Sequence, residues 1–202
     1  MTNTNQLTQS SSSNPGPKRI LLVNVHSALN LGDDAIMAST LRRIATIYPC
    51  YQVTVAAGDP ASWRDKYASI TVLPSLAHWG GSPLVGAWRK RLWMLPFQIL
   101  AFAVIATIYR HWQIRVRLGP AWLSDLLQAY YDADVILSCG GGNFYAYRRF
   151  SPSFLWSIMT LWLAVWLGKP ITMLPQSFGP VNGRIQRFLL AQLLVQVGQI
   201  MV

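Results

Sequence analysis

Apolar residues in this chain gather in short runs that polar loops separate. The first run, at 19–25, is apolar almost throughout, as expected of a parallel strand covered on both faces. Further runs predict strands at 51–57, 69–73, 134–138, 170–174 and 199–202. Between strands, apolar side chains recur at helical spacing in 36–45, 122–130, 154–168 and 184–197. This alternation predicts an α/β fold, a Rossmann-like parallel sheet with helices on both faces.

One apolar segment is too long for a strand. Residues 92–109 are 18 residues without a charge, and as a helix they would span about 27 Å, close to the thickness of a hydrocarbon core. A single crossing would put the first three strands and the last three on opposite sides of the bilayer, and Pro96 and Gln98 also argue against it. We expect a hydrophobic helical insert at about 84–118 that lies in the membrane interface. Burial between domains and a spanning helix are the alternatives.

Charge points to the same region. The chain has 17 Lys and Arg against 7 acidic residues, a net charge of +10, which favours an anionic partner. Six cations flank the apolar segment, which favours a membrane surface, contacted through 89–117, over nucleic acid: Arg89, Lys90, Arg91, Arg110, Arg115 and Arg117. We therefore expect a cytoplasmic protein that is peripheral to the inner face of the cell membrane.

The two ends of the sequence and its cysteines indicate how the chain is organised into domains. Residues 1–18 lack the apolar core of a signal peptide and are expected to be a disordered arm, followed by one Rossmann-like domain at 19–202. Cys50 and Cys139 are far apart, so neither a disulfide nor a metal site is expected. The last predicted strand ends the sequence with no loop or helix after it, and we expect a second domain to be missing.

Three loops follow predicted strands and carry the candidate chemistry. Asp33 would orient sugar hydroxyls, while Asp34 would cap the first helix. His26 is either a general base or a structural histidine. The glycine triplet at 140–142 allows either close approach of a ligand or a tight turn. The expected substrate-binding residues are Asn30, Gly32, Gly140, Gly141, Gly142, Asn143, Gln176, Ser177 and Gly179.

The ordered set of motifs carries a resemblance. Asn30-x-Gly-Asp-Asp-Ala-Ile36, Asp134-Val-Ile-Leu-Ser-Cys-Gly-Gly-Gly142 and Leu174-Pro-Gln-Ser-Phe-Gly-Pro180 resemble the polysaccharide pyruvyl transferase family. The resemblance implies transfer of pyruvate from phosphoenolpyruvate onto two hydroxyls of a sugar or lipid-linked glycan, as a ketal, in exopolysaccharide or cell-wall biosynthesis. No cofactor beyond this donor is expected.

The same resemblance bears on architecture. Family members are about twice this length and resemble GT-B-type transferases with two facing halves, of which this chain would be the N-terminal one. The Arg and His residues that bind the donor are then expected in a second domain or a partner polypeptide. Two other functions remain open: a GT-B-type glycosyltransferase that uses a nucleotide sugar, and a non-catalytic glycan- or lipid-binding module.

Overall fold

A parallel six-stranded sheet forms the centre of the molecule. The computed structural model describes residues 18–80 and 95–200. The strands follow the order β3-β2-β1-β4-β6-β8, and every pairing is parallel. The six runs recognised in the sequence are these strands: β1 (Arg19–Val25), β2 (Gln52–Ala57), β3 (Thr71–Pro74), β4 (Val135–Ser138), β6 (Ile171–Met173) and β8 (Gln199–Ile200). The predicted α/β fold with a parallel sheet is confirmed.

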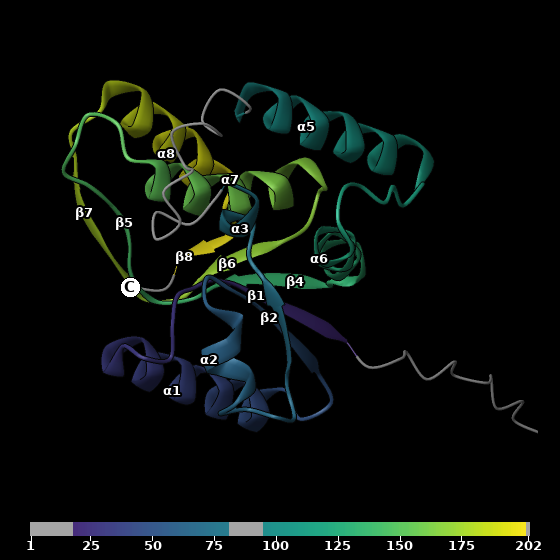
Figure 1. Cartoon of the computed structure of the whole chain (residues 1–202), viewed down its shortest axis with the longest axis vertical. Helices are drawn as coiled ribbons and strands as arrows, with labels where there is room; N and C mark the ends of the chain where they lie inside the picture. The colour runs from purple at the N-terminus through teal and green to yellow at the C-terminus, as the bar shows by residue number, and fades with distance from the viewer. Residues whose placement is uncertain (1–17, 81–94, 201–202) are drawn as a thin grey trace, which may run out of the picture.

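Helices cover both faces of this sheet (Figure 1). One face carries α1 (Leu31–Ile47) and α2 (Pro60–Arg64). The opposite face carries α3 (Ala77–Gly80), α5 (Leu95–Trp112), α6 (Ala121–Asp132), α7 (Pro152–Trp166) and α8 (Arg184–Gln196). Successive residues of a strand point to opposite faces, and β1 therefore feeds two cores. Leu21 and Val23 join the cluster under α6 and α7, while Ile20 and Leu22 join the cluster under α1 and α2.

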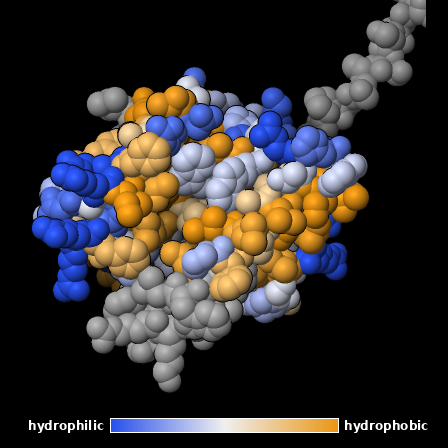
Figure 2. Space-filling model, turned by 90° about the horizontal axis from the view of Figure 1, so that it is seen from above, coloured by the Kyte–Doolittle hydropathy of each residue, from blue (hydrophilic) through white to orange (hydrophobic). Residues whose placement is uncertain are grey.

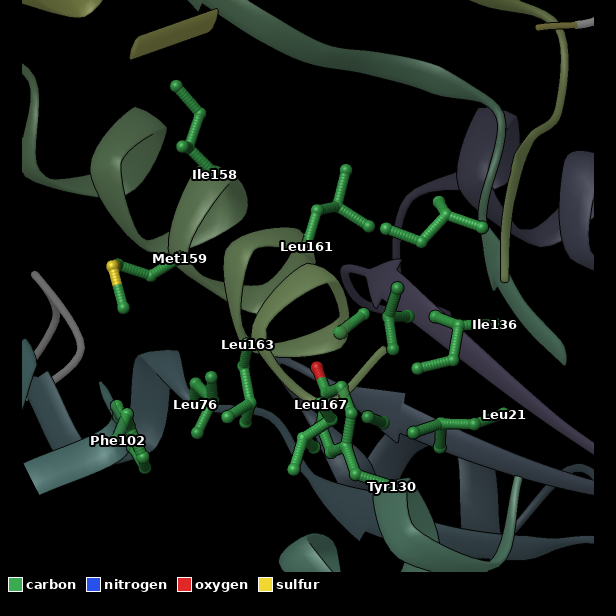
Figure 3. Close-up of a cluster of buried hydrophobic side chains, with 14 of the residues drawn as sticks. Leu21, Leu76, Phe102, Tyr130, Ile136, Ile158, Met159, Leu161, Leu163 and Leu167 are labelled. Atoms are coloured by element: carbon green, nitrogen blue, oxygen red, sulfur yellow. The ribbon is translucent and has the colours of Figure 1, made fainter. Parts of the chain in front are cut away.

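Helix α7 is the centre of the larger core. Beyond its first two turns it is apolar around most of its circumference, as expected of a buried helix. Leu161, Leu163 and the C-cap residue Leu167 are nearly inaccessible. Figure 3 shows these side chains around the helix, beside Leu21 and Ile136 of the sheet. The hydroxyl of Tyr130 on α6 is buried here and donates to the Thr160 carbonyl oxygen at 2.9 Å. That bond ties α6 to α7.

A second, two-stranded parallel sheet lies beyond the carboxyl ends of the main strands. It consists of β5 (Gly141–Ala146) and β7 (Gln176–Val181) and stands at the left of Figure 1. The sequence predicted simple strand–loop–helix connections here, and that prediction is wrong. Glycine, asparagine and proline are depleted in strands, so these segments carry no strand signal of their own.

The apolar segment forms a helix that packs on the domain. Residues 95–112 are α5, whose inner side chains Gln98, Phe102, Ile105 and Ala106 are buried, and α5 packs against α7. Within the described ranges, no helix is both long enough and apolar enough to cross a bilayer. Residues 81–94 of the expected insert and residues 1–17 of the expected arm lie outside the described part of the chain.

Candidate functional site

The candidate site lies where the direction of the chain reverses within the sheet. After β1 the chain turns to α1 on one face, whereas after β4 it continues through β5 to α7 on the other. β1 and β4 are neighbours, so the loops that leave their carboxyl ends diverge. Open α/β sheets bind ligands in the crevice at this point. His26 follows β1 and Cys139 follows β4, which brings two of the predicted loops to the crevice.

A cavity of about 260 Å³ opens at this edge. Its walls come from the end of β1, from β5 and the connection after it, and from the first turns of α7. The lining residues are His26, Gly142, Asn143, Tyr145, Ala146, Tyr147, Arg148, Ser151, Ser153 and Ser157. The volume lies just below the usual range of small-molecule sites, about 300–1,000 Å³, and suits a single small ring. Three predicted site residues, His26, Gly142 and Asn143, line it.

The lining of the cavity combines hydrogen-bonding groups with aromatic rings. Asn143 is 6% exposed, and its side-chain oxygen has no hydrogen-bond partner among the described residues, whereas its Nδ2 donates weakly to the Cys139 carbonyl oxygen at 3.4 Å. A buried acceptor without a donor is costly, so a hydroxyl that reached this oxygen would bind it favourably. The rings of Tyr145 and Tyr147 lie 5.5 Å apart at the wall and offer apolar faces. Arg148 adds positive charge.

The loop that carries His26 is fixed to α2. Ser27 Oγ donates to Asp59 Oδ2 at 2.8 Å, and the Ala28 amide donates to Ser62 Oγ at 3.0 Å. The indole of Trp63 donates to the His26 carbonyl oxygen at 3.2 Å. The hydrogen bond from Ser27 lowers the pKa of Asp59 below its usual value. These bonds hold the His26 backbone in place before any ligand arrives.

Asn24 connects the strands to the cavity wall. Its φ of 59° is in the left-handed region, which asparagine tolerates better than most residues, and the β1–β2 register shifts between Leu22 and Val25. Its Nδ2 donates to Ser138 Oγ at 3.2 Å and to the Ser157 carbonyl oxygen at 3.4 Å. Asn24 therefore joins β1, β4 and α7 beside the cavity. The sequence analysis missed it, although a polar residue inside an apolar strand was a visible signal.

The three predicted loops converge beside Gly141. This glycine pairs with Gln176 across β5 and β7, and Asp33 Oδ1 lies 3.9 Å from the position that a Cβ on Gly141 would take. Burial, with a smaller contribution from the Asp33 carboxylate, raises the pKa of Cys139 to about 12. Both polar side-chain atoms of Gln176 are buried without a partner among the described residues. Asp33 and Gln176 thus form a second polar group at the same edge.

The entrance to α1 differs from expectation. The helix begins at Leu31, and its N-cap is Asn30, whose side-chain oxygen accepts from the Gly32 amide at 3.0 Å. The prediction that Asp34 caps the helix is wrong, because the helix starts three residues earlier. Asp34 instead forms an ion pair with Lys66. Asn30 and Gly32 are exposed, and the structure gives Asn30 a capping role.

Two of the glycines in these loops are required by packing. A Cβ on Gly140 would lie 2.5 Å from the Pro175 carbonyl oxygen, and one on Gly179 would lie 2.5 Å from Cβ of Tyr145. Such contacts are too short for any side chain, so these glycines let β5 and β7 pair closely. Gly141 has a φ of 119°. Ser177 is exposed on β7, and neither it nor Gly179 lines the cavity.

Sequence reasoning missed most of the far wall of the cavity. Tyr145, Tyr147, Arg148 and the three serines were not proposed, although two tyrosines and two arginines follow the glycine triplet within seven residues. Buried Gln186 of α8 supports this wall. With its amide oriented to match its neighbours, it donates to the Arg149 carbonyl oxygen at 3.0 Å and accepts from the Ser151 amide at 2.8 Å. In the described part of the chain, no group of three His, Cys, Asp or Glu residues could hold a metal ion.

Comparison with known proteins gives one match. A family model described as polysaccharide pyruvyl transferase matches residues 30–202. No curated protein and no solved structure matches the chain. The matched range begins at Asn30, the N-cap of α1. It contains all the loops described above except residues 26–29, which follow β1.

Proposed function

Because the chain belongs to the polysaccharide pyruvyl transferase family, we propose that it takes part in moving pyruvate from phosphoenolpyruvate onto two hydroxyls of a sugar. The product is a cyclic ketal on a glycan precursor. The observation that carries the proposal is the cavity at the β1–β4 crevice, with its buried, unpartnered Asn143 oxygen. That oxygen accepts a hydrogen bond from a sugar hydroxyl, and the tyrosine rings cover the apolar face of the sugar.

The reaction assigns a proton-transfer role to the residues at this edge. Two sugar oxygens bond to C2 of phosphoenolpyruvate, C3 gains a proton to become a methyl group, and the bond from C2 to the phosphate oxygen breaks. One hydroxyl proton is balanced by the proton gained at C3, and the other leaves with inorganic phosphate. His26 lines the acceptor cavity and serves as the general base for an attacking hydroxyl. Asp33 holds the neighbouring hydroxyl beside the glycine loop.

The donor requires positive charge. Phosphoenolpyruvate carries a phosphate and a carboxylate, and Arg148 is the cation that lines this cavity. We infer that further cations come from a second Rossmann-like domain, in the same or another polypeptide, in a GT-B-like arrangement that the family resemblance implies. The pocket described here is then mainly the acceptor side of the reaction.

Two variants and one control test this assignment. We expect His26→Gln to lower phosphate release from phosphoenolpyruvate by about 10²–10⁴-fold, the usual contribution of a general base, while sugar binding persists. Asn143→Leu should weaken binding of methyl glycosides, measured by saturation-transfer NMR. His111→Gln is the matched control, because His111 is an exposed histidine on α5, far along the chain from the cavity.

The same assays separate the other two functions. Consumption of a nucleotide sugar in place of phosphoenolpyruvate would identify a glycosyltransferase. Sugar binding without turnover of either donor, with the second domain supplied, would identify a binding module. Either result contradicts the pyruvyl-transfer proposal.

A further inference from the structure

The acidic residues of the chain are unevenly distributed over the molecule. There are seven, all aspartates: Asp33, Asp34, Asp59, Asp65, Asp125, Asp132 and Asp134. Helices α5, α7 and α8 contain none of them. Four of the seven lie on or next to α1 and α2, on the opposite face of the sheet. On the face that carries α5, α7 and α8, these three helices therefore have no negative side chain, while α6 of the same face carries Asp125 and Asp132.

Two of the same helices expose large apolar side chains on their outer surface. Both α5 and α8 pack on α7, and each exposes a stripe of large apolar side chains with helical spacing. On α5 these are Leu100, Val104 and Trp112, and on α8 they are Ile185, Phe188 and Val195, all at least 49% exposed. Figure 2 looks down on this side and shows several groups of hydrophobic side chains, with weakly hydrophilic ones between them and the most hydrophilic ones mainly at the edges. Exposed apolar patches of this kind mark interaction sites.

Cations border the apolar stripes. Arg110 is exposed at the end of α5, and Arg184 and Arg187 are exposed on α8. None of the three takes part in an ion pair found among the described residues. Arg115, by contrast, is paired with Asp132. The three exposed arginines are therefore placed to meet an anionic partner.

We propose that the outer face of α5 and α8 docks on an anionic lipid surface. A helix that packs on its domain with one face and exposes apolar side chains on the other can lie in the plane of a bilayer interface. Its apolar side chains then enter the acyl boundary, and its cations meet lipid phosphates. Trp112 suits the interface because its ring is amphipathic. A protein partner with matching acidic groups is the competing occupant. Lipid is favoured because the apolar side chains are spread over two helices and the charge is of a single sign.

This surface differs from the one expected from sequence, which was limited to 89–117. Residues 89–94 lie outside the described range, and residues 184–197 were predicted as a helix without a role in membrane binding. The proposal does not depend on pyruvyl transfer, because it concerns neither the cavity nor its residues. Anionic lipids are enriched in the cytoplasmic leaflet of cell membranes. The outer face of α5 and α8 would bind there.

Vesicle co-sedimentation of the full chain tests the proposal. We expect binding to phosphatidylcholine vesicles that contain phosphatidylglycerol, and much weaker binding to phosphatidylcholine alone. Arg184→Gln with Arg187→Gln should weaken binding about 25-fold, since a cation near an anionic surface contributes about fivefold. Leu100→Ser with Phe188→Ser should weaken it by about tenfold for each side chain that enters the interface.

Matched controls lie on the other face of the sheet. Arg42 and Arg43 are exposed cations of α1, and Ile47 is an exposed apolar residue of the same helix. Arg42→Gln with Arg43→Gln, and Ile47→Ser, should leave vesicle binding within about twofold of the unchanged protein. Circular dichroism and thermal midpoints of every variant show whether the fold is retained.

Three outcomes would overturn the proposal. The first is the absence of binding to anionic vesicles by the unchanged protein. The second is an equal loss of binding in the α1 controls, which would mean that net charge alone is responsible. The third is that the α5 and α8 variants change the self-association of the chain in size-exclusion chromatography while vesicle binding persists, which would assign the surface to a protein contact.

Discussion

Replacing Gly140 by alanine tests why the glycine triplet is there. The structure places a new Cβ at this position 2.5 Å from the Pro175 carbonyl oxygen. The atom that the new Cβ meets belongs to the backbone, so no side chain can rotate away. The segment that joins β4 to β5 must therefore move away from the start of β7. Gly140 is buried, and it precedes the pairing of Gly141 with Gln176. The expected effect is therefore on the fold of this edge as well as on the site.

The magnitude follows from the cost of overpacking. Inserting a methyl group into a well-packed region costs about 1–3 kcal/mol, and a contact of 2.5 Å against backbone belongs in the upper part of that range. For a domain of this size each kcal/mol lowers the thermal midpoint by about 2–4 °C. We expect Gly140→Ala to lower the midpoint by roughly 4–12 °C. Urea unfolding followed by circular dichroism measures the same free energy directly.

Two glycine variants serve as references. At Gly32 the nearest atom to a new Cβ is the Asn30 side-chain oxygen at 3.4 Å, an ordinary contact in an exposed first turn, so Gly32→Ala should be neutral or stabilise by up to about 1 kcal/mol. At Gly142 the new Cβ meets only the exposed ring of Tyr145, at 3.3 Å. Gly142→Ala should leave stability almost unchanged but reduce sugar binding, because Gly142 lines the cavity.

The reasoning fails if the two phenotypes are exchanged. A stable Gly140→Ala variant that has lost sugar binding would mean that this glycine is required for ligand approach. A Gly142→Ala variant that unfolds at lower urea concentration and binds sugar normally would show that Gly142 serves packing. Equal behaviour of Gly140→Ala and Gly32→Ala would refute the close approach of Gly140 to the Pro175 carbonyl oxygen.

Further predictions concern the groups around the cavity. Burial raises the pKa of Cys139 to about 12 while Cys50 is exposed, so a thiol reagent at pH 8 should modify one cysteine in the native protein and both after unfolding; rapid modification of both would contradict this. Gln186→Leu removes the hydrogen bonds to the backbone at 149 and 151. It should lower the free energy of unfolding, measured in urea, by about 1–3 kcal/mol, and it should weaken sugar binding. An unchanged urea midpoint would mean that the Gln186 amide does not hold this wall of the cavity. The hydrogen bond from Ser27 lowers the pKa of Asp59, so it stabilises the fold above the unfolded pKa and is lost as pH falls through the lower, folded one. Ser27→Ala should therefore destabilise at pH 7, and the difference should shrink progressively as the pH falls below about 4. A stability difference that is independent of pH would count against it.

The main sheet could be predicted because its strands are buried on both faces. Each strand must then be apolar along its length, and the run at 19–25 shows this without any knowledge of its neighbours. The helix pattern at 122–130 was equally informative, because Leu123, Leu126, Leu127 and Tyr130 all enter the core. Local sequence decides these elements, and their boundaries agree with the structure to within a few residues.

The second sheet could not be predicted from local sequence. β5 and β7 contain glycine, asparagine and proline, and they pair only because Gly140 and Gly179 allow two backbones to approach. That pairing buries Asn143 and places Tyr145 and Tyr147 at the cavity wall. The sequence identified Asn143 and His26 because they follow strands, but the tyrosines and serines become neighbours only through the fold. The site therefore arises from tertiary contacts, which local sequence does not reveal. The strands of the sheet that positions it are determined by local sequence.

Helix α7 links the candidate site to the proposed membrane face. Its first turns supply Ser153 and Ser157 to the cavity, and its body is covered by α5 and α8. Fifteen residues of helix extend about 22 Å, so the cavity lies within one short helix of the docking surface. A sugar carried on an anionic lipid would then meet the cavity from the side on which the chain is bound. Loss of vesicle binding should accordingly reduce pyruvylation of a lipid-linked acceptor more than that of a soluble methyl glycoside.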